Sequence, residues 1–282
     1  MRIGITGCSG LVGSELVPLL RNAAQQVVVL DNFTRPGATP KMPRPMMLDW
    51  IVHLAARTAI PRYPGGAACV FRENVDATLA ALDMARATKA KFLFVSSYVY
   101  GPPQVNPVSE THPLLATNSY TASKIAGERC CLSWSVATGQ ALVIVRPFLI
   151  YGVKTTPGRL VSDILDCVLE NKPVTINNAD PQRDHLYVQD FCELLTRILE
   201  HPCQDQQIVN AGSGVCYSNA KVAETIVDIL GGTQAVQVRN RPKATDFAKC
   251  VADISRVKKA FGWSPRYSLR DGLREVLKSL GR

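Results

Sequence analysis

The sequence lacks any apolar run long enough to cross a bilayer, any internal repeat and any low-complexity stretch. The apolar run at residues 141–145 is far shorter than the roughly 20 residues that a transmembrane helix needs. The first residues lead directly into an apolar strand pattern, which leaves no room for a signal peptide. We therefore expect a globular, cytoplasmic protein that does not associate with membranes.

The sequence also lacks the cysteine and histidine spacings of disulfide scaffolds and metal sites. Its nine cysteines include the adjacent pair Cys130 and Cys131, but no Cys-x-x-Cys motif. Its four histidines show no metal-ligand spacing either. We expect reduced thiols and no bound metal.

Acidic residues are in the minority, because 23 Asp and Glu stand against 32 Lys and Arg, giving a formal charge of +9. A strongly basic chain can bind nucleic acid, but here the basic residues are scattered and no aromatic platform accompanies them. We expect no nucleic-acid partner. A solvated basic surface is the better interpretation, with a few arginines that contact a phosphate-bearing small molecule.

The opening of the chain has the pattern of a nucleotide-binding turn. Gly7, Gly10 and Gly13 lie between an apolar strand at residues 2–6 and a helix predicted at about residues 14–20. Such glycines let the backbone turn sharply and approach a pyrophosphate, which the helix N terminus attracts. A second strand ends at Asp31, 18 residues after Gly13, where a carboxylate can accept hydrogen bonds from the adenosine ribose.

This combination predicts a dinucleotide cofactor. Asp31 favours NAD because its carboxylate would repel a 2′-phosphate, while Arg35 nearby leaves NADP open. The residues of this region that we expect to bind the cofactor are Gly7, Gly10, Leu11, Val12, Gly13, Asp31 and Asn32.

Tyr120 and Lys124 form the candidate acid/base pair. They lie four residues apart on a helix predicted at residues 117–137, and therefore on one face of it. An ammonium near a phenol favours the phenolate and lowers its pKa, which makes the tyrosine a usable general acid and base. Taken alone the spacing is common, and Tyr120 could be a surface residue of the helix N terminus.

Strands and helices alternate through the first half of the chain, which predicts an α/β fold with a doubly wound parallel (Rossmann) sheet. Ligands bind such sheets at the carboxyl ends of the strands, where Gly7, Asp31, Ala55 and Ser96 all lie. After residue 147 the pattern loosens into a smaller, interleaved α/β substrate domain. We expect residues 1–152 and 186–212 in the dinucleotide-binding domain, and residues 153–185 and 213–282 in the substrate domain. His53 is expected to be a structural residue at the end of its strand.

These motifs in this order resemble the extended short-chain dehydrogenase/reductases, in their NAD-dependent nucleotide-sugar epimerase/dehydratase branch. The likeness runs nearly end to end. It rests on the glycine turn and on His53-Leu54-Ala55-Ala56, Asn74-Val75, Ser96-Ser97-Tyr98-Val99-Tyr100-Gly101, the segment from Tyr120 to Lys124, Arg146-Pro147-Phe148, Tyr151-Gly152, the segment from Arg183 to Asp190, Ala252-Asp253-Ile254, the segment from Phe261 to Pro265, and Gly272-Leu273-Arg274.

The resemblance implies a role for each matching residue. Ser96 would hydrogen-bond the sugar oxygen that is oxidised or reduced. The alternative is a purely structural role for Ser96, as a cap at the end of its strand. Tyr120 would move the proton, and Lys124 would hold the nicotinamide ribose and tune Tyr120. The resemblance also implies that Leu54, Ala55, Ala56, Tyr120 and Lys124 bind the cofactor. The implied substrate-binding residues are Ser96, Ser97, Tyr98, Tyr120, Arg183 and Arg241, with a plain surface arginine as the equal alternative for Arg241. Asp184, Tyr187 and Asp190 are expected to be structural.

Three departures from the family pattern bear on function. Relatives that dehydrate a sugar carry an Asp-Glu pair directly after the catalytic hydroxyl, where this chain has Ser97 and Tyr98, so dehydration is not expected. Leu149 stands where several relatives have a substrate-contacting asparagine. The link from Asp31 to Asp49 is short enough to lack the usual third strand, which would leave the adenine pocket more open.

We expect an NAD-dependent 4-epimerase of a nucleoside-diphosphate sugar that works through a transient 4-keto intermediate. The alternative within the family is an NAD(P)H-dependent 4-ketoreductase of a nucleotide-linked 4-keto-6-deoxysugar. A remote alternative is a non-catalytic NAD(P)-sensing regulator. By analogy with relatives we also expect a homodimer, paired through the helices predicted at residues 74–88 and 120–137.

Overall fold

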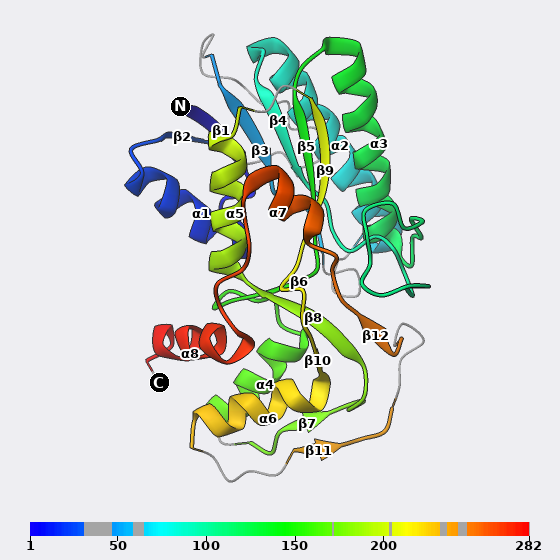
Figure 1. Cartoon of the computed structure of the whole chain (residues 1–282), viewed down its shortest axis with the longest axis vertical. Coiled ribbons are helices and arrows are strands. Elements are labelled where there is room, and N and C mark those ends of the chain that lie inside the picture. The colour runs from blue at the N-terminus through cyan, green and yellow to red at the C-terminus, as the bar shows by residue number, and fades with distance from the viewer. Residues whose placement is uncertain are drawn as a thin grey trace. The chain divides into compact units, whose positions relative to one another are not determined.

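The structure is a computed structural model that describes residues 1–30, 47–58, 65–170, 172–202, 205–231, 236–241 and 247–281. The chain divides into two compact units (Figure 1). Unit 1 contains Met1–Gly101, Glu110–Pro147 and Cys192–Asn210. Unit 2 contains Pro102–Ser109, Phe148–Phe191 and Ala211–Arg282, so the chain passes between the units several times.

Unit 1 is built on a six-stranded sheet with the strand order β2-β1-β3-β4-β5-β9. The pairs from β2 through β5 are parallel; Ile3 of β1, for example, lies opposite both Val27 and Trp50. Its strands are β1 (Arg2–Thr6), β2 (Gln26–Val29), β3 (Trp50–His53), β4 (Lys91–Val95), β5 (Leu142–Pro147) and β9 (Gln206–Ala211). The parallel, doubly wound fold predicted from the sequence is confirmed.

Helices cover the sheet of unit 1. Helices α2 (Gly66–Thr88) and α3 (Ser119–Thr138) pack side by side over β3, β4 and β5 (Figure 1). Helix α1 (Leu11–Asn22) packs against β2, and the Cys192 thiol of α5 (Val188–Glu200) lies 3.7 Å from the Val12 carbonyl of α1. Phe92, Phe94 and Ile144 form the core beneath α2 and α3, where they are fully buried.

The apolar pattern predicted the central strands well because these strands are buried on both faces. Helix boundaries are less accurate: α1 begins at Leu11 rather than residue 14, and α2 begins at Gly66 rather than residue 74. The first two turns of α2 expose Ala67, Ala68 and Phe71, and these exposed apolar residues break the amphipathic period that marks a helix.

Unit 2 contains shorter elements. The central strand of its four-stranded sheet is β8 (Gln182–Tyr187), which pairs antiparallel with β10 (Cys216–Ser218) and parallel with β12 (Lys249–Cys250) and β6 (Leu149–Tyr151). Strands β7 (Thr175–Ile176) and β11 (Gln237–Val238) form a separate parallel pair. The helices of this unit are α4 (Leu160–Leu169), α6 (Asn219–Ile229), α7 (Ser255–Phe261) and α8 (Leu269–Ser279).

Two buried aspartates hold loops of unit 2 together. The Asp184 carboxylate accepts hydrogen bonds from the backbone N–H groups of Ser213 (2.6 Å), Gly214 (3.0 Å) and Ala252 (3.0 Å). The Asp190 carboxylate accepts from the backbone N–H groups at positions 266 (2.9 Å) and 267 (3.1 Å). Both carboxylates therefore satisfy backbone donors, which is a structural role. Within the described residues, no helix is long and apolar enough to cross a membrane.

Candidate active site

The glycine turn joins β1 to α1 in unit 1. Gly7 has φ of 74°, and a Cβ added there would lie 2.7 Å from the backbone nitrogen of Ala55. A Cβ on Gly13 would collide with the carbonyl oxygen of Gly7 and the backbone of Cys8. A Cβ on Gly10 would meet nothing closer than 3.4 Å. Gly7 and Gly13 are thus required by the packing of the protein itself, whereas the bare backbone at Gly10 leaves room for a ligand to approach.

The start of α1 suits an anionic ligand. Gly10 is the N-cap residue in an extended conformation, and no side chain of the described residues caps the helix there. The first N–H groups of a helix have no partner within the helix, and they carry a partial positive charge. The turn and the helix start therefore fit a pyrophosphate, as the sequence predicted.

The residues after β3 lie against this turn. The backbone N–H of Ala55 donates to the Thr6 hydroxyl (3.2 Å), and the backbone N–H of Leu54 donates to the Thr6 carbonyl (3.3 Å). His53 is fully buried, with Nδ1 2.9 Å from the Thr6 hydroxyl and Nε2 3.3 Å from the Thr78 hydroxyl. Both ring nitrogens of His53 are thus within hydrogen-bond distance of threonine hydroxyl groups. Asp31, the predicted ribose contact, and Asn32, a predicted cofactor-binding residue, lie outside the described residues.

The N terminus of α3 is determined by a reciprocal cap. The Asn118 side chain accepts from the Thr121 backbone N–H (2.9 Å), and the Thr121 hydroxyl accepts from the Asn118 backbone N–H (3.1 Å). This cap places Tyr120, half-buried, in the first turn of the helix. Lys124 and Glu128 follow at four-residue intervals, so the three side chains share one face of α3.

Lys124 carries the positive charge on this face of α3. Its ammonium donates to the Val95 carbonyl at the end of β4 (2.7 Å) and lies 4.9 Å from the centre of the Phe94 ring. Burial lowers the pKa of Lys124 to about 8, so the side chain is still mostly charged at pH 7. A largely desolvated positive charge one turn from Tyr120 stabilises a developing phenolate more strongly than an exposed lysine would.

Ser96 follows β4 and extends its pairing, because its backbone N–H donates to the Val145 carbonyl (2.8 Å). Its side chain is buried and donates to Oε1 of Glu128 (2.6 Å). Arg146 of β5 binds the same carboxylate, with Nε 2.9 Å from Oε1 and Nη2 2.7 Å from Oε2. Glu128 was not among the site residues predicted from the sequence. Its position four residues after Lys124 was the signal that could have identified it.

Asn74 of α2 is a second residue whose role the sequence did not reveal. Its side-chain oxygen accepts from the Arg57 backbone N–H (2.7 Å), and its amide donates to the Arg57 carbonyl (3.1 Å) and the Ser123 hydroxyl (2.9 Å). Ser123 in turn donates to the Tyr120 carbonyl (2.7 Å). Asn74 therefore connects the loop after β3 to the turn of α3 that carries Tyr120 and Lys124.

The remaining predicted substrate residues divide between the units. Ser97 and Tyr98 are half-buried in unit 1, where the Tyr98 hydroxyl donates to the Gly101 carbonyl (2.5 Å). Arg183 and Arg241 belong to unit 2. The Arg183 guanidinium stacks 4.0 Å from the centre of the Phe247 ring and donates to the Phe247 carbonyl (2.7 Å). Arg241 is exposed.

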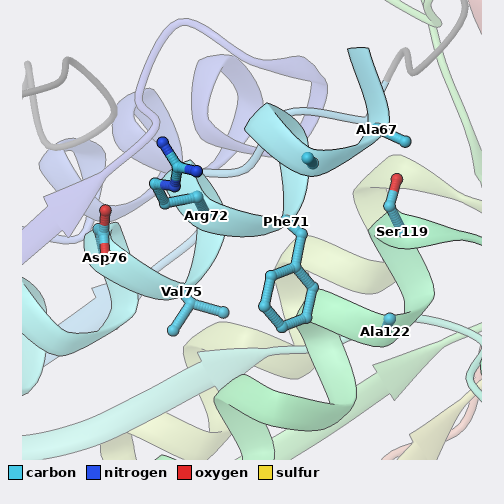
Figure 2. Close-up of a pocket in the computed structure, with 8 residues that line it drawn as sticks. Ala67, Phe71, Arg72, Val75, Asp76, Ser119 and Ala122 are labelled. Atoms are coloured by element: carbon cyan, nitrogen blue, oxygen red, sulfur yellow. The ribbon is translucent and has the colours of Figure 1, made fainter. Parts of the chain in front are cut away.

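A pocket of about 530 Å³ opens beside this region, between the first turns of α2 and α3. Figure 2 shows Phe71, Arg72, Val75 and Asp76 of α2 at its edge, with Ser119 and Ala122 of α3 opposite. Most of this lining is apolar, and its charged members are Arg72 and Asp76. In the part of the chain that the structure describes, no group of His, Cys, Asp or Glu residues is placed to hold a metal ion.

The chain is similar in sequence to proteins of one known family. Residues 3–212 match the sequence model of the family described as the NAD dependent epimerase/dehydratase family. The chain is 30% identical to UDP-glucuronic acid decarboxylase 3 of Arabidopsis thaliana over 301 residues, which covers 97% of this chain and 87% of the relative. It is 28% identical to the uncharacterized UDP-glucose epimerase YtcB of Bacillus subtilis, with 97% and 96% of the two chains covered.

Among solved structures, UDP-glucuronic acid 4-epimerase from Bacillus cereus, in complex with UDP-glucuronic acid and NAD, superposes with a TM-score of 0.87. The two chains are 24% identical, and the superposition covers 99% of this chain and 100% of the other. At this identity the likeness establishes a shared fold.

Proposed function

The chain belongs to the NAD-dependent epimerase/dehydratase family, and from that premise we propose that it epimerises carbon 4 of a nucleoside-diphosphate sugar. The observation that carries the proposal is the geometry of α3, in which Tyr120 lies one turn before the buried Lys124 ammonium. The relatives named above are a UDP-glucuronic acid decarboxylase and a UDP-glucose epimerase, so a UDP-sugar is the first substrate to test.

NAD fits the glycine turn of unit 1. Gly7, Gly10, Gly13 and the start of α1 would hold the pyrophosphate, and residues 54–56, which lie against this turn, would contact the cofactor beside it. When bound, NAD supplies the oxidation and the later reduction of carbon 4.

Tyr120 is the proton-transfer group in this proposal. Its phenolate takes the proton of the sugar 4-hydroxyl as carbon 4 is oxidised, and returns it to the 4-oxygen when the 4-keto sugar is reduced on its other face. Lys124 stabilises the phenolate through its charge, which the Val95 carbonyl and the Phe94 ring hold in place. Arg183 and Arg241 are proposed to bind the diphosphate, because a guanidinium pairs well with phosphate oxygens.

Decarboxylation of a UDP-uronic acid is a second candidate, favoured by the relative named UDP-glucuronic acid decarboxylase 3. Oxidation of carbon 4 makes the carboxylate on carbon 5 part of a β-keto acid. Such an acid loses CO₂, the resulting enolate takes up a proton at carbon 5, and the ketone at carbon 4 is reduced again. The same Tyr120 and Lys124 would serve both reactions, so the fate of the keto sugar distinguishes them.

The test is proton NMR of the purified protein with UDP-, dTDP-, GDP- and CDP-sugars, including UDP-glucuronic acid, and a catalytic amount of NAD. A 4-epimer that accumulates to equilibrium without net NADH formation supports the proposal. A pentose product with release of CO₂ would replace it with decarboxylation. Turnover only of 4-keto sugars with stoichiometric NADH or NADPH would indicate a ketoreductase, and silence on every sugar would favour a cofactor-sensing regulator.

We also propose that two copies of the chain pair through α2 and α3. Helix α2 exposes Phe71 and Leu79 and helix α3 exposes Val136, and Phe71 lines the apolar pocket of Figure 2. Exposed apolar side chains beside an apolar pocket are unfavourable in water, which supports an interface at these helices.

A further inference from the structure

We infer that Phe94 is a positioning residue for Lys124, because its buried ring holds the ammonium in place and keeps it positively charged. Phe94 lies in β4 and Lys124 lies in α3. The consequence for turnover rests on the proposed function, in which the charge of Lys124 stabilises the Tyr120 phenolate. Phe94 acts through Lys124 and not on the substrate.

The Lys124 ammonium is a costly charge to bury. The residue is only 4% exposed, and burial lowers its pKa to about 8. An ammonium has three donors, and its acceptor among the described residues is the Val95 carbonyl, at 2.7 Å. One neutral carbonyl replaces only part of the lost hydration, so a second source of stabilisation is needed.

The Phe94 ring supplies this stabilisation. The Lys124 Nζ lies 4.9 Å from the ring centre, within the range of about 6 Å for a cation–π contact. Phe94 is fully buried, so the contact is desolvated, which is where the negative face of a ring attracts a cation most strongly. An aliphatic side chain would fill the same space without this attraction.

His53 holds one side of the Phe94 ring. The two rings stack with 5.8 Å between their centres and 18° between their planes. His53 itself is fixed by the Thr6 hydroxyl at 2.9 Å and the Thr78 hydroxyl at 3.3 Å. Burial and the nearby charge of Lys124 lower the pKa of His53 to about 3, so this neighbour is neutral and does not repel the ammonium.

Gly127 leaves the space that the Phe94 ring occupies beside α3. A Cβ at position 127 would lie 2.7 Å from Cζ of Phe94, which is closer than real Cβ atoms approach. The missing side chain therefore lets α3 lie close to β4. This approach is what allows Lys124 to reach both the ring and the Val95 carbonyl.

The titratable groups of α3 around Lys124 do not replace the ring. Glu128 follows one turn later and favours the charged lysine, but Arg146 already binds both oxygens of that carboxylate. Burial raises the pKa of the Cys131 thiol, so it is neutral at physiological pH. Tyr120, one turn earlier, gains a negative charge only when it acts as a phenolate. The ring is thus a stabilising contact that Lys124 keeps throughout.

Phe92 is the matched comparison, because it is a core ring of the same strand without this role. It is fully buried like Phe94, and it stacks on His53 with 6.2 Å between ring centres. Its other ring neighbour is Trp134, at 5.6 Å, and the described residues place no cation over it. Replacing either phenylalanine by leucine removes the same atoms from the same core.

The test compares Phe94→Leu and Phe92→Leu with the wild type. The titration of Lys124 is followed by NMR of protein isotope-labelled at lysine, with the resonance assigned by a Lys124→Arg variant. We expect Phe94→Leu to lower the titration midpoint by about half to one pH unit, the effect of losing a desolvated cation–π contact. At pH 8 its kcat should fall about threefold relative to its kcat at pH 6.5. Phe92→Leu should lower the urea midpoint of unfolding to a similar extent and leave the lysine titration at the wild-type value.

Gly127→Ala is the second variant, and it decides the question if Phe94→Leu does not fold. It keeps both Phe94 and Lys124 but forces them apart, while alanine suits a helix better than glycine does. We expect the midpoint of Lys124 to fall here as well, by less than in Phe94→Leu.

A wild-type midpoint in Phe94→Leu would overturn the inference. Equal shifts in Phe94→Leu and Phe92→Leu would overturn it too, because general burial would then control the charge of Lys124. A wild-type midpoint in Gly127→Ala would overturn the placement of the ring by that glycine. A wild type that converts no nucleotide sugar would overturn the proposed function, and the NMR titration would still decide whether Phe94 holds the charge.

Discussion

Arg146 holds the Glu128 carboxylate by both oxygens, at 2.9 and 2.7 Å, in a pair whose two side chains are almost completely buried. The pair joins α3 to β5 on the same face of α3 that carries Tyr120 and Lys124. Arg146 also donates through Nη1 to the Tyr100 hydroxyl (3.1 Å) and the Glu110 carbonyl (3.0 Å). The helix that carries Tyr120 and Lys124 is therefore anchored to the sheet by an ion pair as well as by apolar packing.

Glu128→Gln should lower the free energy of unfolding by about 3–5 kcal/mol, because it leaves the buried Arg146 guanidinium without its counter-charge. Urea unfolding followed by circular dichroism measures the change. Asp83→Asn is the matched control, since Asp83 forms an exposed ion pair with Arg86 on α2 and its loss should cost less than about 1 kcal/mol. Equal losses in the two variants would show that the buried pair does not anchor α3.

Tyr120→Phe should lower kcat about 100- to 10,000-fold, because the ring is retained but the group that moves the proton is lost. Binding of NAD, followed by quenching of protein fluorescence, should change little. A Tyr217→Phe variant, on strand β10 of unit 2, controls for the loss of a phenol elsewhere. Turnover near that of the wild type in Tyr120→Phe would contradict the proposed mechanism.

Activity should fall as the pH rises through about 8. Burial lowers the pKa of Lys124 to about 8, so the ammonium that stabilises the Tyr120 phenolate is lost above that value. The measurement is kcat from pH 6 to 9.5, with circular dichroism at each pH to establish that the fold is retained. A flat profile up to pH 9.5 would mean that the charge of Lys124 is not needed.

Stability should fall with acid partly because of His53. Burial, reinforced by Lys124, lowers its pKa from 6.5 to about 3. Between these values the unfolded chain binds a proton that the folded protein does not, so stability decreases as the pH falls below 6.5, by about 1.4 kcal/mol per pH unit. His53→Gln should show a shallower decline of the urea midpoint from pH 7 to 5, whereas His201→Gln, at an exposed position, should follow the wild type.

Phe71→Glu should convert a dimer into a monomer in light scattering at micromolar concentration, because it places a charge in the apolar face of α2. Val215→Glu, at an exposed apolar position of unit 2, is the control and should leave the oligomeric state unchanged. A wild type that already runs as a single monomeric species would contradict the proposed pairing.

The sequence by itself predicted the features that depend on neighbours along the chain. The glycine turn follows from the conformations that only glycine adopts, and the central strands follow from continuous apolar runs that are buried on both faces. The shared face of Tyr120 and Lys124 follows from helical spacing alone. These features were sufficient for the fold class and the family.

The tertiary structure decided the features that depend on residues far apart in the sequence. Strands β10 and β12 have three and two residues, too few for a periodic pattern, and form only because β8 pairs with them. The hydrogen bond between Ser96 and Glu128 could not be predicted, because it depends on which side of β4 is covered by α3. The ion pair between Glu128 and Arg146 could not be predicted either, because the two residues are 18 positions apart in the sequence. Local spacing determines which side chains share a face, and only packing determines what that face meets.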